Sequence, residues 1–281
     1  MKWLFYIPEY TESSAGIVCC HEFAEEMVKL GEDVEVLTWE TVGKLGTLGL
    51  GKRKFSYKRA TEIEKDRIVV YPEVVPDNPL GCEKVVRFML NKDGLLDGTK
   101  VSRDKGEFIV SFSRTYEDGD FLIHHILFDQ EVFNMEGSLP ILEREISIVY
   151  RGKGTDYIAP DGLKPPIVML TRTGFSRDDL AFILKRSKAL YSADCLSFLL
   201  HEALLCGCAP VITAWKGFTQ AELMKHEIPE VYEMNESGDF SERNIMEKRV
   251  SLIKRLKRYE EQFPSKIREF VEKTKLHFEK K

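Results

Sequence analysis

Apolar positions near the start of the chain follow first a strand pattern and then a helix pattern. The run from Lys2 to Ile7 is typical of a buried strand, and apolar residues recur at helical spacing from Gly16 to Leu30. Gly31 ends that segment, and a second apolar run covers Val34 to Leu37. Strand, helix and strand in this order predict a βαβ unit, which opens a parallel sheet with a right-handed crossover.

The remainder of the first half predicts further strands and one more helix. Little periodicity is found between Thr41 and Lys65, a segment rich in Lys and Gly that we interpret as a loop or irregular insertion. The elements expected after it are a strand over 68–71, a helix from Gly81 to Leu90, and strands over 108–112 and 121–126. We expect them to complete a first lobe that ends near Leu142.

A second series of alternating elements follows. The patterns predict strands over 146–150, 167–170, 189–191 and 210–213, with helices over 177–185 and 198–206. The end of the chain is charged and helical, with apolar residues at steps of three and four before Pro264. The fold class predicted is α/β, with two Rossmann-like lobes over 1–143 and 144–281 and with final helices that could return to the first lobe.

Composition restricts the class of protein but does not identify it. The 281 residues are 43% hydrophobic and 31% charged, which is ordinary for a folded domain. A net charge of −5 gives no basic footprint for nucleic acid. No apolar stretch approaches the roughly 20 residues of a membrane span. The six cysteines form no paired CxxC motif, so we expect reduced, buried thiols in a cytoplasmic protein without a metal site.

The strongest local signal for a site lies between Ser192 and Ile212. An acidic loop leads into a helix that begins near Ser197, and the positive end of such a helix can receive a phosphate. Glu202, inside that helix, could accept hydrogen bonds from vicinal ribose hydroxyls. The simpler interpretation is that Asp194 and Ser197 cap the helix and Glu202 is solvated. Because the helix is apolar nearly all round, however, its carboxylate needs a partner or a polar cleft.

This segment resembles the GT-B glycosyltransferases, in particular the group related to family 4. In those enzymes two acidic residues eight apart precede an Ala, a Gly and a Pro-Val strand, and the second carboxylate holds the donor ribose. Asp194 and Glu202 have that spacing. Asp194 stands where Glu is usual, so its side chain is shorter by one methylene.

A narrower bacterial subgroup of these enzymes is similar over roughly residues 3 to 215. The matching segments, in chain order, are Tyr71-Pro72-Glu73-Val74-Val75, Asn78-Pro79, Val85-Val86-Arg87 through Leu90-Asn91, and Gly152-Lys153-Gly154. The resemblance implies a nucleotide-sugar donor bound by the second lobe.

Basic residues after two strands of the second lobe are candidate partners of the donor diphosphate. Arg151, Gly152 and Lys153 follow one strand, and Arg172 follows the next. Arginine and lysine could neutralise a leaving diphosphate without a metal, and glycine would let the backbone approach it. The alternatives are a basic surface turn for 151–153 and a salt bridge to Asp178 or Asp179 for Arg172.

In the first lobe, candidate residues lie in the first strand–helix loop and at a later strand end. By analogy with GT-B folds, the loop over 12–16, which includes Gly16, would face the transferred sugar or the acceptor; an N-cap at Ser13 or Ser14 explains it almost as well. His124 or His125 could act as a general base, although a histidine in an apolar strand is more often a packed core residue.

The resemblance therefore implies transfer of a sugar from a nucleoside-diphosphate sugar, with no further cofactor, to a saccharide, lipid-linked or protein acceptor in surface polysaccharide or glycoconjugate synthesis. A catalytically silent subunit that binds a nucleotide sugar or a protein is one alternative. An NAD-dependent oxidoreductase or epimerase is another, but the first strand–helix turn lacks Gly-x-Gly-x-x-Gly. The basic residues from Leu252 to Lys281 could touch the inner membrane face, although a helix packed across the lobes explains them better.

Overall fold

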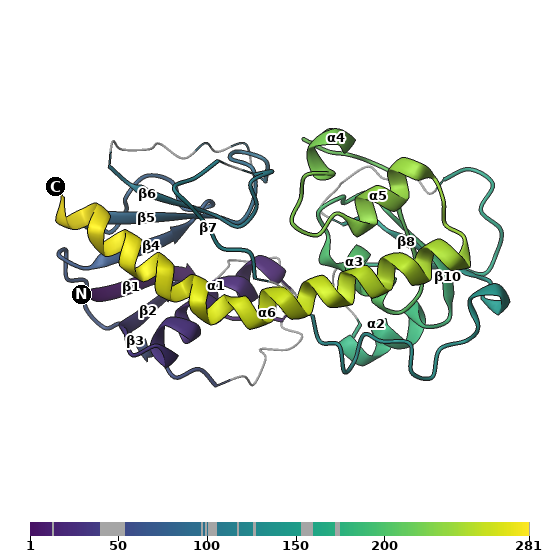
Figure 1. Ribbon diagram of the computed structural model, residues 1–281, viewed down its shortest axis with the longest axis horizontal. Helices are drawn as coiled ribbons and strands as arrows, with labels where there is room; N and C mark the ends of the chain where they lie inside the picture. Colours follow the sequence, from purple (N-terminus) through teal and green to yellow (C-terminus); the bar gives the residue numbers. More distant parts are fainter. Residues whose placement is uncertain are drawn as a thin grey trace. The chain divides into compact units, whose positions relative to one another are not determined.

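The computed structural model describes residues 1–12, 14–39, 54–96, 98, 100, 106–116, 118–125, 128–152, 160–171 and 175–280. The protein is α/β, with a seven-stranded and a four-stranded parallel sheet flanked by helices (Figure 1). Two compact units divide the chain. Unit 1 contains Met1–Leu127 and Arg258–Lys281, and unit 2 contains Phe128–Lys257. The segment from Phe128 to Glu143, which we expected in the first lobe, belongs to unit 2 by its packing.

Unit 1 is built on a parallel sheet whose strand order is β3-β2-β1-β4-β5-β6-β7. Its strands are β1 (Lys2–Pro8), β2 (Asp33–Trp39), β3 (Lys58–Arg59), β4 (Ile68–Pro72), β5 (Lys84–Met89), β6 (Phe108–Ser111) and β7 (Phe121–Leu122). Helix α1 (Ala15–Lys29) joins β1 to the parallel neighbour β2, so the predicted βαβ unit is confirmed. Strand β3 falls within the segment that we interpreted as irregular.

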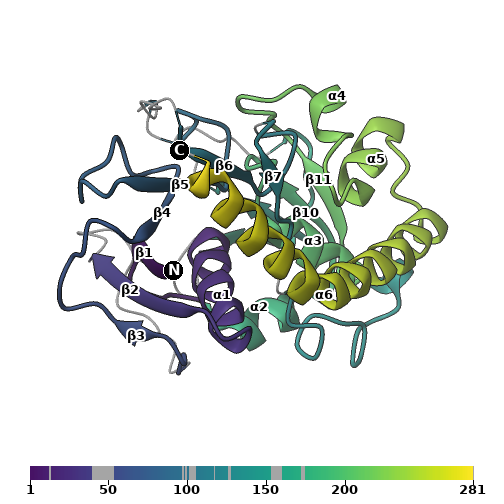
Figure 2. The same cartoon turned by 60° about the vertical axis from the view of Figure 1, so that its left-hand side comes forward.

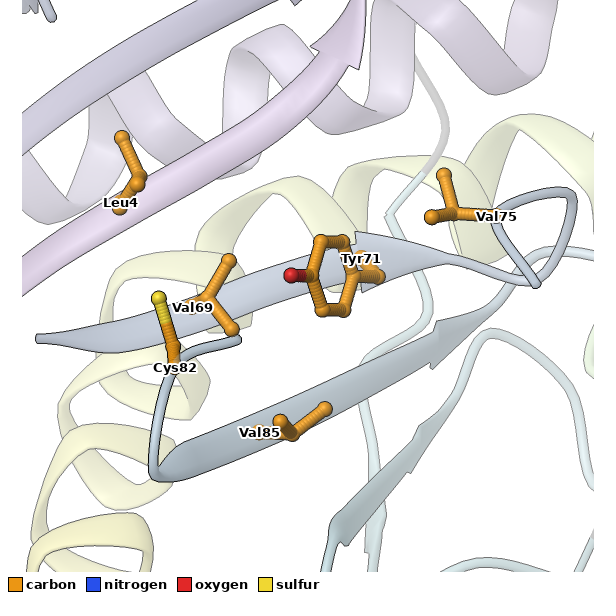
Figure 3. Packing of buried hydrophobic residues seen from close by; sticks show 6 residues of the cluster. All are labelled: Leu4, Val69, Tyr71, Val75, Cys82 and Val85. Carbon is orange, nitrogen blue, oxygen red and sulfur yellow. The ribbon is translucent and has the colours of Figure 1, made fainter. Parts of the chain in front are cut away.

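The two faces of this sheet are covered differently. On one face lie α1 and the C-terminal helix (Figure 2). Aromatic rings pack there: Phe23 of α1 lies 5.3 Å from Phe5 and 5.0 Å from Phe270 of the C-terminal helix. On the other face the buried cluster includes two residues of the β4–β5 connection. Its members, shown in Figure 3, are Leu4, Val69, Tyr71, Val75, Cys82 and Val85.

The prediction of a helix from Gly81 to Leu90 is wrong, because Lys84–Met89 forms strand β5 between β4 and β6. A strand in the interior of a parallel sheet is buried on both faces and so shows no alternation of apolar and polar residues. Periodicity alone cannot distinguish such a run from a buried helix. The predicted strand over 121–126 is also too long, since β7 is Phe121–Leu122.

Unit 2 contains the second parallel sheet, with strand order β11-β10-β8-β9. Its elements are η1 (Ile141–Glu143), β8 (Ile146–Tyr150), β9 (Ile167–Leu170), α2 (Arg177–Leu184), β10 (Ser187–Ser192), α3 (Phe198–Leu205), β11 (Ala209–Ile212), α4 (Gln220–Leu223) and α5 (Glu230–Ser237). The four predicted strands and two predicted helices of this half are confirmed within about three residues at each end. Helices α4 and α5 were not predicted.

The C-terminal segment is a single helix, α6 (Glu242–Glu279), that contains Pro264. We expected separate helices, because a proline inside a helix removes one backbone hydrogen bond. The buried stripe continues on both sides of Pro264, through Leu256, Phe263, Ile267 and Phe270, and this packing holds the helix together. Among the described residues, no helix is both long and apolar enough to cross a membrane.

Candidate functional site

The order in which strands are added to the parallel sheet of unit 2 reverses between β8 and β10. The chain leaves β8 for β9 on one side and then crosses to β10 on the other. In open parallel sheets, ligands bind at the carboxyl ends of strands where the strand order reverses in this way. Tyr150 and Ser192, the last residues of these strands, are paired in register, and the Ala193 N–H donates to the Tyr150 carbonyl over 3.1 Å. The residues that follow each strand are therefore neighbours.

Gly152 and Asp194 lie in direct contact at this edge. Gly152 has a φ of +62°, and a Cβ added to it would lie 2.2 Å from the Asp194 Cβ. Both the backbone conformation and the close approach therefore require glycine. Arg151, next to it, is exposed, whereas Lys153 lies outside the described residues. The structure thus brings Gly152 and Asp194 together from two separate motifs.

Helix α3 begins at the same edge and its first residues are capped. The Ser197 hydroxyl accepts from the Leu199 N–H over 3.3 Å, and the Asp194 carboxylate accepts from the Leu196 N–H over 3.2 Å. The capping role of Ser197 is therefore confirmed, whereas Asp194 bonds the loop before the helix, because Leu196 precedes the N-cap. No acidic residue occupies the first turn of α3, so the positive end of the helix dipole is not neutralised from within the helix.

Two arginines bind the opposite end of α3. The Arg144 side chain donates to the Cys206 carbonyl over 3.1 Å, and Arg249 donates to the Leu205 carbonyl over 2.7 Å. Cations at a helix C-terminus complement its negative partial charge. Arg144 also donates to the Leu139 carbonyl over 2.9 Å, which ties the segment before η1 to unit 2.

Glu202 is buried in α3, with 4% of its surface exposed, so its interpretation as a solvated helix residue is wrong. Its Oε1 lies 2.8 Å from Nη1 of Arg177, the first residue of α2. Burial raises the pKa of Glu202, and the ion pair with Arg177 acts in the opposite direction. The partner that a carboxylate in an apolar helix requires is therefore an arginine of the preceding helix.

The Arg177 guanidinium also lies over the ring of Phe133, with 4.3 Å between Cζ and the ring centroid. The Phe133 loop is held by the Asp129 side chain, which accepts from the N–H groups of Glu131 and Val132 over 3.1 Å each. Sequence reasoning did not identify Arg177 or Phe133. The only available signal was the general need of Glu202 for a partner.

Beside Glu202, His201 packs among aromatic rings. It is 2% exposed and lies 5.8 Å from Phe128 and 6.2 Å from Tyr232, measured between ring centroids. Burial lowers the pKa of His201 to about 4, so the ring is neutral near pH 7. Phe128 also contacts Phe198, at 5.3 Å, which explains why the chain joins unit 2 from Phe128 onward.

In unit 1, Gly16 lies inside α1, where a Cβ would meet only Leu90 Cδ1 at an ordinary 3.7 Å. Ser14 occupies the N-cap position, but its side chain makes no capping hydrogen bond. Ser13 and Arg172 lie outside the described residues, so neither the alternative cap nor the second diphosphate partner is described.

His124 is a packed residue of unit 1. It is 7% exposed, its Nδ1 lies 2.9 Å from the Phe112 carbonyl, and its ring lies 4.9 Å from Tyr259. His125 stacks on Phe263 with 3.6 Å between centroids. Both histidines therefore make the contacts of packed core residues, which was the alternative to a general base.

The motif residues of β4, β5 and the connection between them form several internal hydrogen bonds. The Tyr71 hydroxyl donates to Asn78 over 2.9 Å, and the Leu90 N–H donates to Glu73 over 3.1 Å. Arg87 is fully buried and donates to Glu107 over 2.7 Å and to the Val75 carbonyl over 2.8 Å. Arg87 of strand β5 is therefore an internal ion-pair partner. These residues shape the helix-free connection between β4 and β5.

All six cysteines are free and buried, as expected. Burial raises the pKa of Cys19, Cys195 and Cys206 to about 12, so these thiols are protonated at neutral pH. Within the described part of the chain, no group of three or more His, Cys, Asp or Glu side chains is placed to hold a metal ion.

The chain matches no protein-family model, and no curated protein matches it. The residues of the β8–β10 edge are therefore the features of this protein that indicate a function.

Proposed function

We propose that this protein is a glycosyltransferase of the GT-B type that binds a nucleoside-diphosphate sugar at the β8–β10 edge of unit 2. The observation that supports it best is the arrangement at this edge. Two neighbouring parallel strands end there, at a point where the strand order reverses. They are followed by the Gly152–Asp194 contact, the start of α3 and the Glu202 carboxylate. The sequence resemblance to family 4 enzymes involves the same residues.

In the proposed complex, the diphosphate lies at the N-terminus of α3. Backbone N–H groups and the helix dipole stabilise its charge, and Gly152 lets the backbone approach it. Arg151 adds a positive charge, with Lys153 and Arg172 as further candidates. Glu202 accepts hydrogen bonds from the ribose hydroxyls.

In the proposed reaction, an acceptor hydroxyl oxygen forms a bond to the anomeric carbon while the bond from that carbon to the diphosphate oxygen breaks. The hydroxyl proton leaves to a base, and the electron pair leaves with the diphosphate, whose added charge the cations and the α3 N-terminus stabilise. We assign no residue to the base, because His124 is packed between Phe112 and Tyr259.

A ligand panel tests the nucleotide site. UDP, GDP, ADP, CDP and NAD are added at saturating concentration, and the shift in Tm is measured, because a ligand at 100 times its Kd stabilises the native state by about 2.7 kcal/mol. We expect one or more ribonucleoside diphosphates to raise the Tm and NAD to have no effect. A shift with NAD alone would contradict the proposal and favour a dinucleotide-binding protein.

Comparison with 2′-deoxy ligands tests the role of Glu202. If its carboxylate binds the vicinal hydroxyls, UDP should bind more tightly than dUDP, and GDP more tightly than dGDP, by about tenfold or more, since a hydrogen bond to a charged group contributes about 1.5–3 kcal/mol. Glu202→Ala should remove this preference. Glu236→Ala, an exposed carboxylate of α5, is the matched control and should retain it. A preference for ribose that survives in Glu202→Ala would refute the assignment.

A catalytically silent nucleotide-sugar-binding subunit is the second candidate function. One observation favours it: the Asp194 carboxylate, shorter than the usual glutamate, accepts a hydrogen bond from its own loop at Leu196. Measured release of nucleoside diphosphate from UDP-, GDP- or dTDP-sugars, with and without glycan acceptors, separates the two. Binding without any turnover would favour the silent subunit.

A further inference from the structure

Arg177 is fixed at a defined place by its neighbours in unit 2. It is the first residue of α2, which begins in a capping box: the Asp179 N–H donates to the Ser176 hydroxyl over 3.1 Å, and the Ser176 N–H donates to the Asp179 carboxylate over 3.2 Å. Its guanidinium then lies over the Phe133 ring and reaches Glu202 on α3. Three separate segments therefore meet at one guanidinium.

The exposure of the two partners is unequal. The Glu202 side chain is 6% exposed and the Arg177 side chain is 36% exposed, so the arginine is the more accessible member of the pair. A ligand bound to Glu202 would share the carboxylate with this guanidinium, which lies 2.8 Å from Oε1. The pair is therefore not an ordinary surface salt bridge, because its carboxylate is buried and is the only charged side chain of α3.

We propose that Arg177 is a positioning residue of the nucleotide site, which holds the Glu202 carboxylate ionised and oriented to receive two ribose hydroxyl groups. This inference rests on the proposed function. None of the segments that carry the resemblance to family 4 enzymes contains Arg177.

The chemistry of the ligand explains why the charge on Glu202 matters. An ionised carboxylate offers about four lone-pair sites, of which one receives Arg177 Nη1, so two hydroxyl donors can still bind. A protonated carboxyl group carries a donor of its own and accepts less strongly. The ionised form of Glu202 should therefore be the one that binds vicinal hydroxyls.

The charged groups near Glu202 act in opposite directions. Burial raises the pKa of Glu202, and the nearby Asp129 carboxylate also raises it, whereas Arg177 lowers it. Removal of Arg177 should therefore move the pKa of Glu202 further upward. The buried carboxyl group would then be protonated over a wider range of pH.

The experiment compares Arg177→Gln and Arg177→Lys with Arg186→Gln in the full chain. Arg186 is a suitable control because it lies just beyond α2 and stacks on Phe182, with 3.6 Å from Cζ to the ring centroid, without a contact to Glu202. Circular dichroism and unfolding curves first establish that each variant is folded. Carbon NMR of ¹³C-labelled glutamate, with Glu202→Gln to assign the signal, then gives the pKa of Glu202 directly.

We expect Arg177→Gln to raise the pKa of Glu202 by about one unit or more, because an opposite charge within hydrogen-bond distance typically shifts a carboxyl pKa by 1–3 units. Arg177→Lys, which keeps the charge, should give a smaller change, and Arg186→Gln should give none. An unchanged pKa of Glu202 in Arg177→Gln overturns the inference.

Binding of UDP, GDP and ADP between pH 5.5 and 9 supplies the second readout, measured by calorimetry. The phosphate groups titrate alike for every variant, so a difference between variants belongs to the protein. In Arg177→Gln, the loss of affinity on acidification should begin about one pH unit or more higher than in the wild type, and raising the pH should restore binding. If the wild type and Arg177→Gln lose affinity at the same pH, the inference is overturned and the proposed function is not. If the wild type binds none of the three nucleotides, the proposed function is overturned.

Discussion

At the residue scale, the candidate site depends on contacts that a sequence does not display. The spacing of Asp194 and Glu202 and the glycine at 152 are visible in the chain, and they pointed to one sheet edge. The identity of the Glu202 partner was not visible, because Arg177 is 25 positions away and its neighbours Asp178 and Asp179 carry opposite charge. Sequence distance gives no measure of which cation a buried carboxylate meets.

Gly152→Ala tests the close approach at the site. The new Cβ would overlap the Asp194 side chain, and the alanine would have to adopt a φ of +62°. We expect a loss of stability of roughly 2–4 kcal/mol, the sum of backbone strain and overpacking, measured by chemical denaturation, together with weaker binding of nucleoside diphosphates.

Gly162→Ala is the matched control for this change. Gly162 also has a positive φ, +79°, but a Cβ there meets nothing within 4 Å. Its substitution should cost only about 1–2 kcal/mol and leave ligand binding unchanged. Equal losses of unfolding free energy in the two variants would show that the overlap with Asp194 adds nothing to the cost of the substitution.

At the scale of elements, the sequence predicted strands and helices well where amphipathic patterns or caps mark them. It failed at β5, because Val85, Val86, Phe88 and Met89 are all buried and the run carries no periodicity. It also failed at α6, where packing on both sides of Pro264 overrides a local helix breaker. Both failures have one physical cause: tertiary burial decided the conformation, and tertiary burial is not encoded in a short window of sequence.

Helices α5 and α6 are joined within unit 2 by one buried and one more exposed ion pair, which offer a direct comparison. Glu230, 1% exposed at its side chain, accepts from Arg255 over 2.7 Å and from Ser251 over 2.8 Å. We expect Glu230→Gln to lower the free energy of unfolding by about 1–3 kcal/mol, because buried donors lose a charged acceptor.

The control is Glu233→Gln on the same helix, whose partner Lys248 is 28% exposed. Exposed pairs contribute roughly 0–1 kcal/mol, so this variant should be close to the wild type. Urea denaturation monitored by circular dichroism checks both. If Glu230→Gln is as stable as Glu233→Gln, the buried pair does not hold α6 to α5.

At the scale of the whole molecule, the chain forms two units, and the first is discontinuous in sequence. The C-terminal part of α6 supplies Phe270, which contacts Trp3 at 5.4 Å and Phe23 at 5.0 Å in unit 1. The sequence indicated only that the final helices could return to the first lobe. The packing of Phe128 in unit 2 was not foreseen, because it lies in a segment without a clear periodic pattern.

Phe270→Ala tests whether the end of the chain completes unit 1. Removal of this fully buried ring should cost about 3–5 kcal/mol. Hydrogen exchange followed by mass spectrometry should then show faster exchange in β1, β4 and β5, with β8 and β10 unaffected. Leu276→Ala, on the same helix but 53% exposed, is the control and should leave both sets of strands protected. Faster exchange in unit 2 alone would contradict the assignment of this segment to unit 1.

The discontinuity of unit 1 also sets an order of events during synthesis. Its sheet is synthesised before unit 2, yet the aromatic side chains of β1 and α1 lack their Phe270 neighbour until the residues that follow unit 2 have been added. Unit 2, whose residues are contiguous, has all of its own parts by Lys257. During synthesis, unit 2 can therefore complete its fold before unit 1 does. This is the reverse of the usual order, in which amino-terminal domains fold first.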